Sequence, residues 1–144
     1  MKVLEFVNTH APSLRPTATL QDAVDKLDLY QVTLLPVVDE GGAVVGVLTE
    51  TQVFNQLFSA WLETHRTTGE TLRLEGFRPT ARTLAQAPIQ YSPVPVLDEH
   101  DPIEVAVAQM VQHGYDTLPV IGEGRFIGTI RLIDCCQALI GDTE

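Results

Sequence analysis

The stretch LLPVVDEGGAVVGVLTETQ, residues 34–52, decides the fold, because the chain repeats it later as TLPVIGEGRFIGTIRLID, residues 117–134. Each copy reads as a short apolar strand, a turn rich in glycine, a second strand and the start of a helix. The two copies align without a gap up to their turns, and one residue is missing from the second turn. Such self-similarity indicates one supersecondary unit used twice.

A helical pattern precedes each copy. In the first, Thr19 and Asp22 predict a capping box ahead of an amphipathic helix. In the second, Asp101 is the expected N-cap and Pro102 the first helical residue. Gly114 is the expected C-terminal stop. Each unit is therefore expected to run β-α-β-β-α.

The helix that closes the first copy is long and carries two adjacent apolar columns that include Phe54 and Trp61. These columns indicate either core or an oligomer face. The helix is expected to end at Thr67-Thr68-Gly69. The polar segment that follows contains Gly76 and Pro79 and is interpreted as a connection. We therefore divide the chain into residues 1–66, a connection over 67–81, and residues 82–144, which together form one domain.

Composition excludes several functions. The chain has 144 residues and a net charge of −10, which disfavours nucleic acid and anionic membranes as partners. No apolar run is long enough to span a bilayer, and the start of the chain lacks a secretion signal, so we expect a cytoplasmic protein. The excess of arginine over lysine is associated with prokaryotic genomes rich in G and C.

Catalytic and metal-binding motifs are not evident. The adjacent Cys135 and Cys136 are expected to be reduced, and the four histidines have no metal-ligand spacing, so no metal is expected. The chain has no nucleophile elbow, zinc-protease motif or P-loop, and we do not expect an enzyme.

The doubled LPVV and LPVI stretches and the helices before them resemble the cystathionine-β-synthase (CBS) domain family in its tandem arrangement, the Bateman module. The resemblance covers nearly the whole chain. It implies an α+β (α/β) fold of two pseudo-symmetric β-α-β-β-α repeats packed sheet to sheet. It also implies a regulatory module that binds an adenosine-containing ligand such as AMP, ADP, ATP or S-adenosylmethionine, in some cases with Mg²⁺. Such modules often form homodimers and act on a separate effector protein.

The family signature after the second strand is Gly-x-x-Thr/Ser-x-x-Asp, in which the hydroxyl holds phosphate and the acid holds the ribose. Each copy here departs from it. The first keeps the hydroxyl of Thr49 but has Gln52 in place of the acid. The second keeps Asp134 but has Arg131 in place of the hydroxyl. Arg131 can hold a phosphate, fill the cleft or pair with a carboxylate. Asp134 and Thr49 can alternatively be simple helix-start residues.

Carried over residue by residue, the resemblance predicts two clefts between the repeats. Cleft A, the favoured nucleotide site, is expected to contain Asp134, Arg131, Val7, His10, Pro12, Val32, Thr33, Asp116 and Thr117. Cleft B, the weaker site, is expected to contain Thr49, Thr51, Gln52, Gln90, Pro93, Pro95 and Tyr115, with Tyr115 either stacking on a base or plugging the site. The main functional hypothesis is a ligand-sensing module. The alternative is a degenerate CBS pair that serves only as a structural or dimerisation module.

Overall fold

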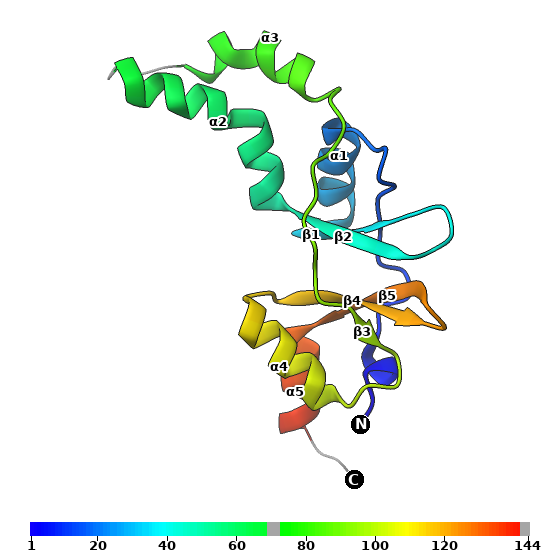
Figure 1. The fold of residues 1–144 in the computed structure, drawn as a ribbon. Helices are drawn as coiled ribbons and strands as arrows, with labels where there is room; N and C mark the ends of the chain where they lie inside the picture. Colours follow the sequence, from blue (N-terminus) through cyan, green and yellow to red (C-terminus); the bar gives the residue numbers. More distant parts are fainter. Residues whose placement is uncertain (69–72, 142–144) are drawn as a thin grey trace.

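The computed structural model describes residues 1–68 and 73–141, which form two stacked halves (Figure 1). A small sheet in each half faces the other half, and the helices lie on the outer sides (Figure 1). The first half contains α1 (Leu20–Tyr30), β1 (Leu34–Val38), β2 (Val44–Thr49) and α2 (Glu50–Thr68). The second contains β3 (Leu97–Asp98), α4 (Ile103–His113), β4 (Thr117–Gly122), β5 (Arg125–Arg131) and α5 (Leu132–Ile140). A 3-10 turn, η1 (Val3–Phe6), opens the chain, and α3 (Leu74–Leu84) lies between the halves. The fold is the predicted α+β pair of repeats.

The two hairpins have equivalent registers. Leu35 pairs with Leu48 across β1 and β2, and Leu118 pairs with Ile130 across β4 and β5. Both pairs are antiparallel, and their registers shift at equivalent positions, after Val37 in β1 and after Val120 in β4. β3 adds to β4 in parallel, whereas the first half has only a single bridge at the equivalent place. A backbone hydrogen bond of 2.8 Å from Phe126 N to Gly42 O joins the two hairpins.

Helix boundaries follow the predicted caps, with one exception. The side chains of Thr19 and Asp22 form the expected reciprocal capping box of α1. Gly114 ends α4 in the left-handed conformation. The prediction for Asp101 is wrong, because its carboxylate accepts a hydrogen bond from Asp98 N, and Pro102 occupies the N-cap position without a side-chain cap. The preceding turn takes the carboxylate that would otherwise cap the helix.

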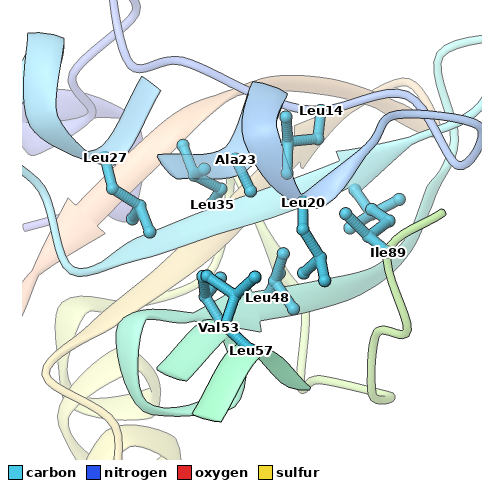
Figure 2. Close-up of a cluster of buried hydrophobic side chains, with 10 residues drawn as sticks. Leu14, Leu20, Ala23, Leu27, Leu35, Leu48, Val53, Leu57 and Ile89 are labelled. Atoms are coloured by element: carbon cyan, nitrogen blue, oxygen red, sulfur yellow. The ribbon is translucent and has the colours of Figure 1, made fainter. Parts of the chain in front are cut away.

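Each half has its own hydrophobic core. Side chains from α1, β1, β2 and α2 point toward one another in the first, where Leu35 and Leu48 are fully buried (Figure 2). The second core is built from α4, the strands and α5 around Met110 and Leu118. All five residues of β1, LLPVV, are buried without alternation, because the strand contacts α1 of its own half and β4 of the other half.

The halves exchange their leading segments. Val3 is fully buried in the second core, although it belongs to the first repeat in sequence. Ile89 is buried in the first core and reaches it from the leading segment of the second repeat (Figure 2). Asn8 pairs with Thr129 of β5, and Ser92 pairs with Val47 of β2. Each repeat therefore needs a segment of the other to complete its core.

The predicted connection is partly helical. α2 ends at Thr68, as expected; Gly69 lies outside the described residues. α3 packs on α2 through Phe77 and Phe58, whose ring centroids are 6.1 Å apart. Pro79 lies within this helix, where it has no N–H to donate to the carbonyl of Glu75. None of the helices in the described ranges is long and apolar enough to cross a membrane.

Candidate functional site

A cavity of about 550 Å³ lies between the repeats, at the position predicted for cleft A. Its size is in the range of small-molecule sites. The end of α1 and the start of β1 supply one wall, and the start of β4 and the junction of β5 with α5 supply the other. Seven of the nine predicted residues line it: Pro12, Val32, Thr33, Asp116, Thr117, Arg131 and Asp134.

Two predicted residues of cleft A lie elsewhere. Val7 packs against the second core, close to Gly128. His10 is exposed, and its backbone N donates to Asn8 Oδ1 at 3.0 Å. Neither lines the cavity. Both lie on the segment that crosses to the second half, and the exchange of segments places them beside the cleft instead of inside it.

Sequence reasoning missed several lining residues. Gln31 has a left-handed backbone at the end of α1, which turns the chain into the cleft. Asn8 enters through its pairing with Thr129. The other missed residues lie within two positions of predicted ones, and this proximity was the available signal. The lining residues that were not predicted are Asn8, Ala11, Tyr30, Gln31, Leu34, Thr129 and Ile133.

Arg131 and Asp134 lie at the junction of β5 and α5. Arg131 is the N-cap residue, and Asp134 lies three residues on, so both side chains project from one side of the helix start. Arg131 Nε donates to Asp134 Oδ2 at 3.0 Å, and Nη2 donates to Oδ1 at 2.8 Å. The hydrogen bond and the negative charge of Asp134 raise the pKa of Arg131 above its usual value. In the second copy, the retained acid Asp134 is therefore paired with the arginine that stands in place of the signature hydroxyl.

The start of α5 stays open to a ligand. Among the residues that the structure describes, no side chain caps its N-terminus, so first-turn N–H groups remain available. The N–H of Leu132 is the exception, since it donates to Asp116 O at 2.8 Å. A carboxylate has about four lone-pair sites, so Asp134 can hold Arg131 and still accept two hydroxyl donors. This arrangement suits a sugar diol.

Cleft B differs from cleft A. Thr49, Thr51 and Tyr115 line a hollow of about 520 Å³ together with Glu50 and Asp116. The other four predicted residues, Gln52, Gln90, Pro93 and Pro95, do not line it.

Gln52 is engaged by the protein itself. Gln52 N donates to Thr49 Oγ1 at 3.2 Å, and Thr49 N donates to Gln52 Oε1 at 2.8 Å, which is a reciprocal capping box. Gln52 Nε2 also donates to Ser92 Oγ at 2.6 Å. The backbone of Gln90 is held by the side chain of Gln56: Gln90 N donates to Gln56 Oε1 at 3.0 Å, and Gln56 Nε2 donates to Gln90 O at 2.8 Å. The helix-start alternative for Thr49 is what the geometry shows.

A third hollow, about 570 Å³, is an apolar groove between α1 and α2. Leu27, Val53 and Leu57 form its floor, and Phe54 is 45% exposed at its side. Within residues 1–68 and 73–141, no three His, Cys, Asp or Glu side chains gather as metal ligands do.

Comparison with known proteins places the chain in a family. The CBS domain model matches residues 3–59 and 89–141, and this chain belongs to the CBS domain family. No curated protein sequence shows significant similarity to it.

Solved structures share its fold. A CBS domain-containing protein of unknown function from Kribbella flavida is 19% identical, with 99% of each chain covered and a TM-score of 0.75. A CBS domain pair/ACT domain protein from Thermotoga maritima is 23% identical, with 97% of each chain covered and a TM-score of 0.71. The protein CBSX2, solved in complex with AMP, is 21% identical, with 96% of each chain covered and a TM-score of 0.68. The chain is thus a tandem CBS pair, a class of module that is commonly regulatory.

Proposed function

We propose that this protein is a ligand-sensing CBS pair, without catalytic activity, that binds an adenosine-containing ligand in cleft A. The candidate ligands are AMP, ADP, ATP and S-adenosylmethionine. The observation that carries the proposal is the carboxylate of Asp134 at the open start of α5, beside a cavity of about 550 Å³ between the repeats. The AMP complex of CBSX2, which has the same fold, supports an adenosine ligand.

The cleft also suggests how binding is transmitted. Val32 and Thr33 come from the first repeat, and Thr117, Arg131 and Asp134 come from the second. A ligand that contacts both walls stabilises one relative placement of the repeats, by as much as its affinity differs between placements. We propose that a separate effector protein senses this placement.

The apolar groove between α1 and α2 supports a homodimer. Phe54 and Val24 expose apolar surface beside it. A second copy of the chain would bury this surface, and the two apolar columns of α2 would then serve both as core and as interface.

The second candidate is a structural module without nucleotide binding. Its support is that side chains of both signatures satisfy each other: Arg131 with Asp134, and Gln52 with Thr49 and Ser92. A protein of this kind needs no ligand to satisfy these signature side chains.

Thermal unfolding in the presence of AMP, ADP, ATP, S-adenosylmethionine and NAD, each with and without Mg²⁺, separates the two candidates. A ligand at 100 times its dissociation constant adds about 2.7 kcal/mol to the free energy of unfolding. At least one adenosine ligand is expected to raise the Tm. No shift with any of them at millimolar concentration would leave the structural candidate.

A further inference from the structure

The charged side chains around cleft A carry more negative than positive charge. Arg131 is the single cation among the lining residues that the structure describes, and Asp116 and Asp134 are the two acids. We infer that cleft A selects nucleosides by charge, accepting a neutral or cationic 5′ group and rejecting a polyphosphate. This inference rests on the proposed function and narrows the ligand class for that same cleft.

Asp134 neutralises Arg131. Two of the five N–H donors of the guanidinium already bond the carboxylate, and both of its oxygens are used. The remaining lone pairs of Asp134 can receive a ribose diol while the ion pair stays intact. A phosphate beside Arg131 would therefore meet a cation whose charge is already balanced.

Asp116 adds a charge that no described residue balances. It lies just before β4, and its carbonyl accepts from Leu132 N, which places it against the start of α5. No ion pair joins it to any cation within the described ranges. It lines both cleft A and cleft B, so its charge acts on either site.

The first repeat provides an internal comparison for Asp116. Thr33 O accepts from Glu50 N at 2.9 Å, just as Asp116 O accepts from Leu132 N at 2.8 Å. Both residues line both clefts. The backbone role is therefore served by an uncharged residue at one position and an acid at the other. The carboxylate of Asp116 is not needed for the fold of this junction, which leaves its charge free to select a ligand.

The start of α5 opposes this field only in part. A helix N-terminus contributes roughly half a positive charge. Together with Arg131, it does not outweigh two carboxylates. The chain as a whole carries −10, which adds a repulsive field for an anion. Each phosphate beyond the first meets this field without a further cation among the described lining residues.

The experiment compares ligands that share base and ribose. Isothermal titration calorimetry at low ionic strength, without Mg²⁺, would measure the dissociation constants of adenosine, AMP, ADP, ATP and S-adenosylmethionine. We expect the dissociation constants of adenosine and S-adenosylmethionine to be lower than that of ATP by about tenfold or more. Added salt should reduce this difference in affinity.

Two variants shift the charge in opposite directions. Asp116→Asn should lower the dissociation constant of ATP by about threefold or more and leave that of adenosine unchanged. Arg131→Gln should increase the difference in affinity between adenosine and ATP, since it removes the single described cation among the lining residues. Glu123→Gln, at the turn between β4 and β5, is the matched control with the same loss of a carboxylate, away from the cavity. It should change no ligand's affinity.

The outcomes are distinct. ATP binding as tightly as adenosine, or Asp116→Asn changing every ligand equally, would overturn charge selection while the adenosine-binding function stands. No binding by any ligand would overturn both. Circular dichroism of each variant verifies that the repeats remain folded.

Discussion

Arg131 and Asp134 form a bidentate ion pair at the place where Thr49 and Gln52 form a capping box in the first repeat. Both pairs are three residues apart and both begin the closing helix. Arg131 and Asp134 line a cavity with their charged groups, whereas Gln52 is hydrogen-bonded to Thr49 and Ser92. Equivalent positions in the two repeats therefore make different kinds of contact.

The ion pair is expected to contribute little stability. Arg131 has 61% of its side chain exposed, and exposed pairs contribute about 0–1 kcal/mol. Arg131→Ala should therefore change the free energy of unfolding by less than about 1 kcal/mol, measured by urea denaturation.

Asp134→Ala should abolish the ligand-induced rise in Tm, while Gln52→Ala should retain it. A ligand shift that survives in Asp134→Ala would contradict the role of this carboxylate.

The hydrogen bond between Gln52 and Ser92 is expected to couple the two repeats. Gln52→Ala removes this bond and half of the capping box, and should cost about 1–2 kcal/mol. A double-mutant cycle with Ser92→Ala should give a coupling of about 0.5–1.5 kcal/mol. Gln21→Ala is the control, because the side chain of Gln21 bonds Asp25 within α1, at an exposed position and inside one repeat. Additive effects of the Gln52 and Ser92 changes would show that the bond does not join the repeats.

Two glycines allow the exchanged segments to pass close to the strands. A Cβ on Gly46 would lie 2.5 Å from Ser92 O, and one on Gly128 would collide with Asn8 O. Gly46→Ala and Gly128→Ala should each destabilise the protein by about 1–3 kcal/mol. Gly76 is the control, since an added Cβ meets no described atom there and the residue lies in α3. Gly76→Ala should instead stabilise by up to about 1 kcal/mol, and a loss at all three positions would argue against the close approach.

The exchange of leading segments makes Val3 a core residue of the second repeat. Val3→Ala should lower the free energy of unfolding by about 2 kcal/mol, because two buried methyl groups are lost. Its neighbour Leu4 is 47% exposed, and Leu4→Ala should change the value by less than about 0.5 kcal/mol. Equal effects of the two changes would mean that the segment does not dock as described.

The adjacent cysteines should react at different rates. Cys135 is fully buried, and burial, together with the negative charge of Asp134 and Cys136, raises the pKa of its thiol. Thiolate is the reactive form, so a raised pKa and burial both slow alkylation. Mass spectrometry after iodoacetamide treatment should find Cys136 modified first and Cys135 only after unfolding. Cys136→Ser should then leave a native protein that resists alkylation.

Much of the fold was predictable because it is local. The capping box at Thr19, the stop at Gly114 and the two hairpins follow from residues that are neighbours in sequence. The Asp101 cap failed because its carboxylate accepts a hydrogen bond from Asp98 N, and sequence spacing does not rank this donor against the N–H groups of the helix start. In the candidate site, the placement of Arg131, Asp134 and Asp116 in one cleft was expected from the resemblance to the CBS family, whereas the choice of Asp134 as the partner of Arg131 was left open.

The sequence by itself determined the doubled unit, its element order and the different ends of the two copies. The tertiary structure decided three further things: that Val3 and Ile89 cross to the opposite core, that Gln52 turns to Ser92, and that Arg131 pairs with Asp134. Hydrophobic periodicity reports that a residue is buried but not against which neighbour. A polar side chain takes whichever partner the folded chain brings within about 3 Å. The partner of Gln52 therefore comes from a segment distant in sequence, whereas the partner of Arg131 lies three residues away and is selected by the folded structure from several possible groups.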